Sequence, residues 1–550
     1  MRNLLAVIAI LFYSQTGLAQ FQGEAEVIHT LGGVATLGWA VSPLTDIDGD
    51  GVTDILIGAT AASTAEVRSG ATGVGIFQFQ LANSELGYSV ADAGDVNNDG
   101  THDIITGGVT NLGIANVYSG ADGSLLWSFP GLELGDRQGS AVAPAGDINN
   151  DGHADLMVGA EGYPNGSQNG RAYIYSGADG QVLRTLEAED SQDRFGGGTA
   201  LIKDLNNDGV DDHIIGAWAG GPDGEGRVYV YSGADGSELF RLDPDDRGSV
   251  FGQFFVADAG DVDNDGTHDV YVGDYNHANG DGRAYVFSGA DQQVLYRFEG
   301  TNAEGAGPGR SAGDVNNDGH DDLIVGFYTS SVGAPQAGRV TVYSGKDGTE
   351  LQSWVSDVAG AAVGFDAVGI GDVNGDGKYD YLLSAALVNI VFVMAGNVER
   401  PDNFVLNPGL NGSWFNQDTS GQGFFIDVFP GIPLVFLAWF TYDTSQPPMD
   451  ATAVVGHPGH RWITAQGSFS GKTAILDVTN TSGGIFDDPE NTSNSEPGGY
   501  GTITLSFEDC TSGMVDYQLT GTTPMLSGSV PIKRIAQDNV ALCESLTADP

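Results

Sequence analysis

Hydrophobic residues in the first 400 positions fall into short runs separated by turns rich in Gly, Asp and Asn. One unit shows the pattern: an alternating run over 86–94, an acidic loop, an apolar run over 103–108, and further runs over 115–118 and 124–129. Runs of this length, bounded by turn residues, are typical of β-strands joined by hairpins. We therefore predict four antiparallel strands, A to D, in each unit, which is the composition of one propeller blade.

This unit recurs at a nearly constant interval. The acidic loop between strands A and B begins at Asp46, Asp95, Asp147, Asp204, Asp261, Asp314 and Asp372, with spacings of 49 to 58 residues. Self-similarity at such a period is the signature of a repeat architecture. The sequence thus predicts an all-β fold whose main part, residues 20–398, is a seven-bladed β-propeller.

The seventh unit is one strand short. After its acidic loop come strand B at Tyr381 and strand C at Ile390, and the pattern then stops. Residues 24–31 resemble the fourth strands of other units, such as the segment 181–187. We expect them to complete the last blade, because closing the ring removes the exposed strand edges of an open array.

The nine-residue acidic loops have the composition of calcium sites. Side-chain oxygens at positions 1, 3, 5 and 9 and the carbonyl of position 7 can converge on one cation, and Gly at position 6 permits the sharp turn. An EF-hand would continue to a Glu at position 12 between helices, whereas position 9 here leads directly into strand B. The predicted ligands are Asp46, Asp48, Asp50, Val52, Asp54; Asp95, Asn97, Asp99, Thr101, Asp103; Asp147, Asn149, Asp151, His153, Asp155; Asp204, Asn206, Asp208, Val210, Asp212; Asp261, Asp263, Asp265, Thr267, Asp269; Asp314, Asn316, Asp318, His320, Asp322; and Asp372, Asn374, Asp376, Lys378, Asp380.

A simpler interpretation is that acidic, glycine-rich segments are merely favourable hairpin turns. Two carboxylates about 5 Å apart repel by roughly 3 kcal/mol at an effective dielectric of about 20, and the ligand positions of the seven loops hold 23 carboxylates. Such crowding favours a bound cation, and an all-oxygen set that includes a carbonyl favours Ca²⁺ over Mg²⁺. We expect up to seven calcium ions, which stabilise the propeller.

Three motifs recur around these loops: Leu86-Gly-Tyr-Ser-Val or Phe195-Gly-Gly-Gly before them, Gly-Asp-Val-Asn-Asn-Asp-Gly within them, and Val158-Gly-Ala-Glu-Gly-Tyr after them. Together they resemble the FG-GAP repeat of integrin α-subunit N-terminal domains and their bacterial relatives, over roughly residues 21–398. The resemblance implies a seven-bladed propeller with Ca²⁺ in the A–B loops and a ligand-binding opposite rim. Integrin α chains carry the full loop in only some blades, whereas this chain keeps it in all seven, which favours a stability role for the metal over a receptor role.

The strand order places the loops on two rims. The A–B and C–D turns share one rim, where Ser-Gly-Ala-Asp-Gly recurs at 119–123, 176–180 and 232–236, and the B–C and D–A loops share the other. The B–C loops vary and present aromatic residues at similar places: Tyr163, Trp218, Tyr275 and Tyr328. Varied loops on a rigid frame are where recognition usually resides. We predict a protein or glycan ligand at this rim, with packing between blades as the alternative role of the aromatic residues.

Five of the nine histidines lie in or beside the acidic loops: His102, His153, His213, His268 and His320. Because position 7 binds through its carbonyl, we expect the side chains of His153 and His320 to point into solvent. His457 and His460 flank a turn without further clustered ligands, so we predict no metal site there. No nucleophile motif stands out: no Gly-x-Ser-x-Gly elbow occurs in a strand-to-helix setting, and there is no His-Glu-x-x-His. A carboxylate pair of the glycosidase kind stays open, but none is singled out among the many Asp and Glu residues, and we predict no catalytic residues.

The N-terminus and the charge bear on location and partners. Met1-Arg-Asn is followed by an apolar run to about Tyr13 and a small-residue pattern ending at Ala19, which predicts a signal peptide over residues 1–19. No later run is long enough to span a membrane, so we expect a secreted or cell-surface protein. With 73 acidic and 21 basic residues the net charge is −52, which argues against nucleic acid or an anionic membrane as partner.

A different pattern follows a linker at 399–407. Aromatic alternation over 412–429 and 434–442, and strand-length segments at 461–467, 473–478, 501–507 and 515–519, predict a separate antiparallel β domain over 408–550. Motifs such as Gly412-Ser-Trp-Phe-Asn resemble an accessory module at the ends of exported bacterial proteins, and that resemblance transfers no function. Trp414, Trp439 and Trp462 could form a sugar platform, but we favour core packing. The only cysteines, Cys510 and Cys543, are expected to form a disulfide rather than stay as free thiols.

These observations favour a calcium-binding, secreted or cell-surface propeller that acts as an adhesion or binding protein for a macromolecular ligand. Two alternatives stay open: an extracellular hydrolase, acting on phospholipid or polysaccharide, with an active site on the propeller rim, and a structural matrix protein. The oligomeric state is not predicted.

Overall fold

The computed structural model describes residues 21–547 except 23–24, 34, 188, 246–247, 400–403, 417–422, 443–459, 483–492, 495–498, 508, 523 and 537–538. The chain divides into two compact units, residues 1–400 and 401–550, and each is described by itself. The predicted signal peptide, part of the predicted linker and His457 lie outside the described residues.

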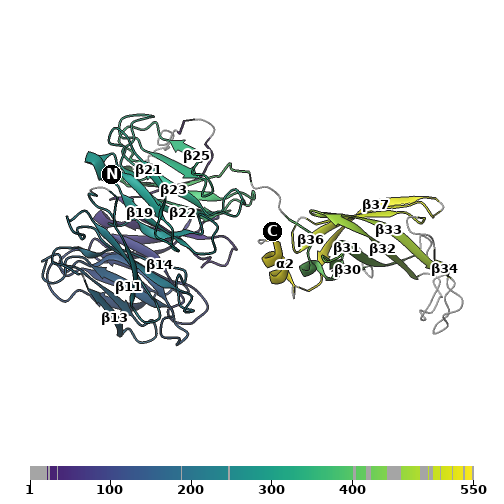
Figure 1. The fold of residues 1–550 in the computed structure, drawn as a ribbon, viewed down its shortest axis with the longest axis horizontal. Helices are drawn as coiled ribbons and strands as arrows, with labels where there is room; N and C mark the ends of the chain where they lie inside the picture. Colours follow the sequence, from purple (N-terminus) through teal and green to yellow (C-terminus); the bar gives the residue numbers. More distant parts are fainter. Residues whose placement is uncertain are drawn as a thin grey trace, which may run out of the picture. The chain divides into compact units, whose positions relative to one another are not determined.

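The first unit is a β-propeller of seven four-stranded antiparallel sheets, as the sequence predicts (Figure 1). Each sheet is numbered here as a blade and its strands are given in the order A to D. Blade 1 holds β2 (Leu37–Leu44), β3 (Asp54–Ala59), β4 (Thr64–Arg68) and β5 (Gly75–Gln80); blade 2 holds β6 (Ser89–Gly94), β7 (Asp103–Gly108), β8 (Ile114–Tyr118) and β9 (Leu125–Pro130); blade 3 holds β10 (Gln138–Gly146), β11 (Asp155–Ala160), β12 (Arg171–Tyr175) and β13 (Val182–Glu187).

The remaining blades repeat this arrangement. Blade 4 holds β14 (Phe195–Ile202), β15 (Asp212–Ala217), β16 (Arg227–Tyr231) and β17 (Glu238–Leu242); blade 5 holds β18 (Val256–Gly260), β19 (Asp269–Asp274), β20 (Arg283–Phe287) and β21 (Val294–Glu299); blade 6 holds β22 (Ala306–Gly313), β23 (Asp322–Phe327), β24 (Arg339–Tyr343) and β25 (Glu350–Val355); blade 7 holds β26 (Ala367–Gly371), β27 (Asp380–Ala385), β28 (Ile390–Met394) and β1 (Val27–Gly32).

Blade 7 confirms the predicted closure of the ring. β1 pairs antiparallel with β28, with Val27 opposite Met394 and Gly32 opposite Ile390. The N-terminal strand therefore supplies the outer strand of the blade that ends the propeller. This arrangement joins the two ends of the ring through hydrogen bonds and leaves no open blade edge at the junction.

Strand B is the packing centre of every blade. All six residues of each strand B are buried, which explains its run of Ile, Leu and Val without polar alternation. Its glycine allows neighbouring blades to approach closely: a Cβ on Gly58 would lie 2.0 Å from the carbonyl oxygen of Gly87 in the next blade. The same contact joins Gly159 to Gly196, so the repeated glycines set the spacing between blades.

Short helical turns interrupt three B–C loops: η1 (Thr60–Ala62), α1 (His277–Gly280) and η2 (Ala386–Val388). Within the part of the chain that the structure describes, no helix is both long and apolar enough to cross a membrane.

The second unit is a closed antiparallel barrel of eight strands. Its strands run in the order β32 (His460–Ser470), β31 (Leu434–Tyr442), β30 (Gly423–Phe429), β29 (Gly412–Phe415), β37 (Leu526–Arg534), β36 (Ser512–Leu519), β35 (Thr502–Phe507) and β33 (Thr473–Ser482), and β33 pairs back with β32. The two-residue β34 (Ser493–Asn494) extends β33. The sequence analysis did not identify β37, whose Ser, Gly and Pro residues lack a clear apolar alternation.

The barrel interior is a packed core. Trp414 and Trp439 are buried within it, which agrees with the packing role that we favoured over a sugar platform. The side chain of Trp462 lies outside the described residues. Phe404 and Leu406, which the sequence analysis assigned to the linker, also pack into this core, so the packing of the unit begins before residue 408.

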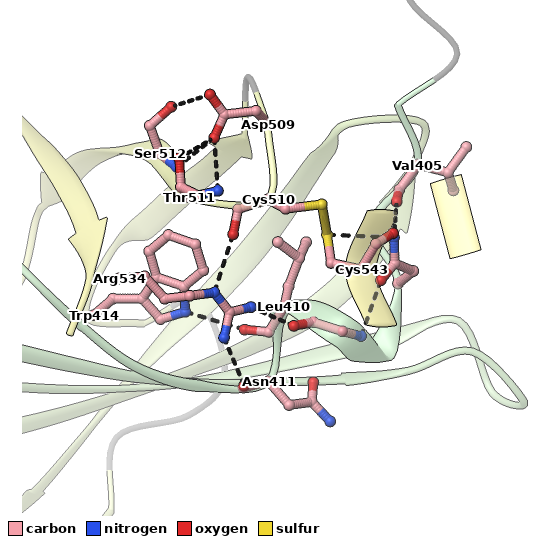
Figure 2. Close-up of a disulfide and its surroundings, with 12 residues drawn as sticks. Val405, Leu410, Asn411, Trp414, Asp509, Cys510, Thr511, Ser512, Arg534 and Cys543 are labelled. Carbon is pink, nitrogen blue, oxygen red and sulfur yellow. Dashed lines mark hydrogen bonds between the residues drawn. A yellow bond between two sulfur atoms is a disulfide. The ribbon is translucent and has the colours of Figure 1, made fainter. Parts of the chain in front are cut away.

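One end of the barrel is tied by the predicted disulfide (Figure 2). Cys510, in the turn between β35 and β36, is bonded to Cys543 in the C-terminal helix α2 (Val540–Thr547). The buried Arg534 donates from Nε to the carbonyl of Cys510 at 3.0 Å, and its guanidinium lies 4.9 Å from the ring centre of Trp414. It also donates to the carbonyl of Gly409 in the short turn η3 (Pro408–Leu410). These contacts fix the helix and η3 to the end of the barrel.

Candidate functional site

The acidic A–B loops are ordered by their own backbone. In all seven loops the position 1 carboxylate accepts one hydrogen bond from the position 5 N–H, at 3.0 to 3.1 Å, and one from the position 6 glycine N–H, at 2.6 to 2.9 Å. The position 5 carboxylate accepts from the position 7 N–H at 2.8 to 3.2 Å. Positions 4 and 6 have positive φ, which explains why only Asn or Gly occurs at position 4 and only Gly at position 6. The seven loops therefore share one conformation.

The position 9 aspartates connect this loop to the C–D turn of the same blade. All seven are fully buried. In blade 6, Asp322 accepts from the N–H of Val315 in the A–B loop and from the N–H of Gly345 in the C–D turn, both at 2.9 Å. Equivalent pairs of bonds, at 2.8 to 3.1 Å, occur in the other six blades; in blade 7, which has no C–D turn, the second donor is Gly396, just after strand C. The A–B and C–D turns therefore share one rim, as predicted.

Burial raises the pKa of these position 9 carboxyls, and the neighbouring aspartates of each loop add to the rise in most blades, while the backbone N–H donors oppose it. The pKa reaches about 6 for Asp54, Asp103, Asp155 and Asp212, about 7 for Asp269 and Asp322, and is also raised for Asp380. A bound cation would favour the ionised form and reverse the shift. Keeping seven such groups ionised at neutral pH is costly without a compensating positive charge.

The position 3 side chains complete a set of oxygen donors. The oxygens Asn97 Oδ1, Asp263 Oδ1 and Asn316 Oδ1 are buried and accept no hydrogen bond from the described residues. In the two loops with Asp at position 3, the carboxylate oxygens of positions 1, 3 and 5 lie within 4.8 Å of one another: Asp46, Asp48 and Asp50, and Asp261, Asp263 and Asp265. Unpartnered acceptors that converge beside other carboxylates fit an oxygen-liganded cation.

Two histidine side chains differ from our expectation. His153 and His320, at position 7, do not simply face solvent: the Nδ1 atom of each lies 2.8 Å from a backbone carbonyl in the A–B loop of the preceding blade, that of Val96 or Val262. The expectation rested on the loop that holds each histidine, whereas the ring places the loop of the preceding blade within reach. These side chains therefore link neighbouring blades.

The opposite rim carries a closed circuit of six aromatic rings. Successive centroids are 5.1 to 6.4 Å apart, within the usual range for aromatic contacts. The circuit consists of Trp39, Tyr88, Phe254, Tyr275, Tyr328 and Phe365. All six are half-buried and line the mouth of the channel between the strands A. We call these residues the aromatic circuit.

Only two of the four predicted rim aromatics belong to the aromatic circuit, Tyr275 and Tyr328. Trp218 instead donates from Nε1 to the buried Glu161 at 2.7 Å and stacks beneath Arg194. Tyr163 lies 3.7 Å beneath the guanidinium of Arg171. The structure therefore brings Tyr275 and Tyr328 together and separates them from the other two.

The four other members of the aromatic circuit were missed by the sequence analysis. Trp39, Tyr88, Phe254 and Phe365 each stand seven residues before the first Asp of an acidic loop, at the start of a strand A. The corresponding residues of the other blades are Ser140, Gly197 and Gly307. This alignment was available from the sequence, but only the ring closure shows that position to be at the channel mouth.

Comparison with known proteins supports the repeat assignment. A family model for the FG-GAP repeat matches residues 37–76, 138–175 and 311–343, which lie in blades 1, 3 and 6. The chain is similar to integrin alpha-4 of Xenopus laevis, 33% identical over 161 residues that cover 27% of this chain and 15% of that protein. It is similar to human integrin alpha-IIb, 32% identical over 187 residues, covering 31% of this chain and 16% of that one.

Two further similarities are more limited. Human phosphatidylinositol-glycan-specific phospholipase D is 38% identical over 127 residues, which cover 20% of this chain and 14% of that protein. A chain in the crystal structure of BBS1N in complex with ARL6DN, soaked with lead, aligns over 68% of this chain and 99% of its own length with 11% identity and a TM-score of 0.46, a level at which no conclusion follows. The matches to curated relatives thus span less than a fifth of each relative.

The fold and the seven matching loops define a repeat-built, seven-bladed β-propeller followed by a closed β-barrel. The family model matches FG-GAP repeats in three of the seven blades, and the fold is that of an FG-GAP and integrin-alpha-like β-propeller.

Proposed function

We propose that this protein is an extracellular, calcium-stabilised binding protein that holds a protein ligand on the rim formed by its B–C and D–A loops. The observation that supports the proposal most directly is the aromatic circuit on that rim, on the face opposite the acidic loops. Similarity to integrin alpha chains, limited to the propeller repeats, adds support for a binding role.

Calcium would be held at the seven A–B loops by the predicted oxygen ligands. Positions 1, 3, 5 and 9 would offer side-chain oxygens, and position 7 would offer its carbonyl. The cation would neutralise carboxylates such as that of Asp322, a group for which burial raises the pKa to about 7. The loop conformation shared by all seven blades supports this assignment, and the unpartnered oxygens Asn97 Oδ1, Asp263 Oδ1 and Asn316 Oδ1 add support in blades 2, 5 and 6. Bound calcium would then stabilise the blades, because it binds only the folded loops.

The geometry of the aromatic circuit favours a protein ligand over a glycan. Neighbouring rings meet at interplanar angles that vary from 22° between Phe254 and Tyr275 to 85° between Tyr328 and Phe365, so the six rings do not form one flat surface. A sugar ring stacks best on a flat platform, whereas tilted rings around an opening suit the insertion of side chains. Half-buried Tyr, Trp and Phe residues are also the residue types that dominate protein interfaces.

A binding screen tests this function. The secreted full-length protein would be probed against protein and glycan arrays in calcium and in EDTA, and then with Tyr328→Ala and with Phe425→Ala, a control on the outer wall of the barrel, where Phe425 is 52% exposed. We expect a protein ligand whose affinity falls about 30-fold or more in Y328A, the loss typical of an interface hot spot, and is unchanged in F425A. Ligands confined to the glycan array, or equal losses in both variants, would overturn the proposal.

Few observations support the alternative that this protein is a hydrolase. The similarity to phosphatidylinositol-glycan-specific phospholipase D covers 14% of that protein, and the Gly-x-Ser-x-Gly spacing at residues 309–313 lies within strand A of blade 6 rather than at a strand-to-helix turn. Hydrolytic activity that is lost when one rim carboxylate such as Glu161 is replaced would favour the enzyme instead.

A further inference from the structure

Behind the aromatic circuit the seven strands A enclose a cavity of about 460 Å³. The residue four places before each acidic loop is small in five blades: Ser42, Ala91, Ala143, Ala200 and Ala257. All five line this cavity, which we call the lumen. The side chains one place closer to the rim are mostly valines, so the wall is largely apolar.

The lumen is long and narrow. Its lining runs over five successive positions of strand A, for example from Ser140 to Pro144 in blade 3. At about 3.3 Å per residue this corresponds to a depth of about 13 Å. Pockets of this volume with apolar walls and few polar groups are typical small-molecule sites, and the narrow shape favours a chain over a fused ring system.

Most polar groups of the lumen already have partners. The hydroxyls of Ser89 and Ser140 donate to the carbonyls of Gly139 and Gly196 in the next blades, at 2.9 and 3.1 Å. The hydroxyl of Ser42 donates to the carbonyl of Pro43. The hydroxyl hydrogens of these serines are therefore already used in hydrogen bonds to backbone carbonyls.

One charged side chain in the lumen keeps unused donors, and one buried hydroxyl on its wall lacks a partner. Thr199 is 8% exposed, and its buried hydroxyl has no partner among the described residues. Among the described residues, Arg310 is the only lysine or arginine that lines the lumen. One of its terminal nitrogens pairs with Asp366, while a guanidinium has five donors. Thr199 and Arg310 stand five and four places before their acidic loops, near mid-depth.

We propose that the lumen binds one medium-chain monocarboxylate, with its carboxylate on Arg310 and its alkyl chain directed toward the aromatic circuit. The chain would contact Val90, Val142 and Val256, and about 10 Å of wall separates Arg310 from the ring level. Arginine binds carboxylates through paired N–H donors and can serve Asp366 and a ligand together. Two carboxylates also line the lumen, but both already have partners: Asp366 pairs with Arg310, and Asp258 accepts from the Gly260 N–H and lies 2.9 Å from His268 Nδ1. This site is separate from the protein ligand proposed for the rim.

Calorimetry on the calcium-loaded full-length protein tests the proposal with three probes that share a chain: octanoate, octanol and octyltrimethylammonium. We expect saturable binding of one octanoate, weaker binding of octanol and the weakest binding of the ammonium. Arg310→Gln should weaken octanoate at least tenfold and octanol less than threefold. Because the net charge of −52 repels anions at long range, octanoate affinity should rise with salt.

Substitutions that fill the lumen test the position of the chain. Ala91→Leu and Ala200→Leu, in two different blades, should each abolish binding of octanoate and octanol, while Ala121→Leu in an exposed C–D turn should not. A variant is used only if its melting temperature matches that of the wild type. Two lumen variants are included so that the test still holds if one of them fails to fold. Absence of octanoate binding, tightest binding of the ammonium probe, or equal effects of A121L and A200L would overturn the proposal. So would binding of phosphatidylcholine vesicles without octanoate binding.

Discussion

Replacing Asp322 by Asn separates the two roles of a position 9 carboxylate. Asp322 is fully buried, and its two oxygens accept N–H bonds from Val315 and Gly345. The Asn side chain has one oxygen and one NH₂ group, so one of these buried N–H groups loses its acceptor. The expected cost is about 1 to 3 kcal/mol whether or not metal is present.

In the presence of calcium, D322N should lose further stability. The variant also loses an anionic ligand, and a site filled at a calcium concentration 100 times its Kd contributes about 2.7 kcal/mol to stability. We therefore expect D322N to lower the free energy of unfolding of the propeller by about 4 to 6 kcal/mol in calcium. In EDTA the loss should be about 1 to 3 kcal/mol or less, because the buried carboxyl, with its pKa raised to about 7, is then itself unfavourable when ionised.

Urea unfolding followed by tryptophan fluorescence and circular dichroism, in 5 mM calcium and in EDTA, measures both losses. Asp347→Asn is the matched control: it lies in the C–D turn of the same blade, is exposed, and accepts from the Thr349 N–H at 3.0 Å, which Asn can also do. D347N should leave unfolding unchanged in both conditions. Equal losses for D322N with and without calcium would show that no metal binds at this loop.

Three further predictions concern pH and redox state. Calcium affinity should fall steeply from pH 7.5 to 5.5 in titrations with a calcium electrode, because protons compete with the metal for carboxyls such as that of Asp269. Burial raises the pKa of this carboxyl to about 7. An affinity that does not change with pH would contradict this prediction. Burial lowers the pKa of His213 to about 4, below its usual value of about 6.5. The free energy of unfolding should therefore fall by up to about 3 kcal/mol as the pH drops from 6.5 toward 4, because the unfolded chain then binds a proton that the folded chain does not. His213→Gln should flatten this pH dependence in the calcium-loaded protein. Reducing Cys510–Cys543, which are 33 residues apart, should destabilise the barrel by about 3 to 4 kcal/mol in calorimetry and leave the propeller transition in place.

The repeat pattern was sufficient to predict much of the fold. Seven acidic loops at near-equal spacing predicted seven blades, and the missing strand after Ile390 predicted the pairing of the segment that begins at Val27. These features are local: a strand is recorded by its apolar run and a turn by its Asp, Asn and Gly residues. The barrel was predicted less completely, because β37 carries no strong alternation.

The conformation of each acidic loop, and the calcium site predicted in it, follow from sequence alone, since the predicted ligands lie within nine consecutive residues and the loop folds on itself. The aromatic circuit and the lumen were decided only by the tertiary structure. Trp39 and Phe365 are 326 positions apart in sequence and 5.1 Å apart between ring centres, because closure of the ring brings blades 1 and 7 together. Arg310 and Thr199 likewise reach one cavity only because the seven strands A surround a common axis. The repeated sequence pattern predicts the strands and turns of each blade. Contacts between residues of distant blades depend instead on the number of blades and on the closure of the ring.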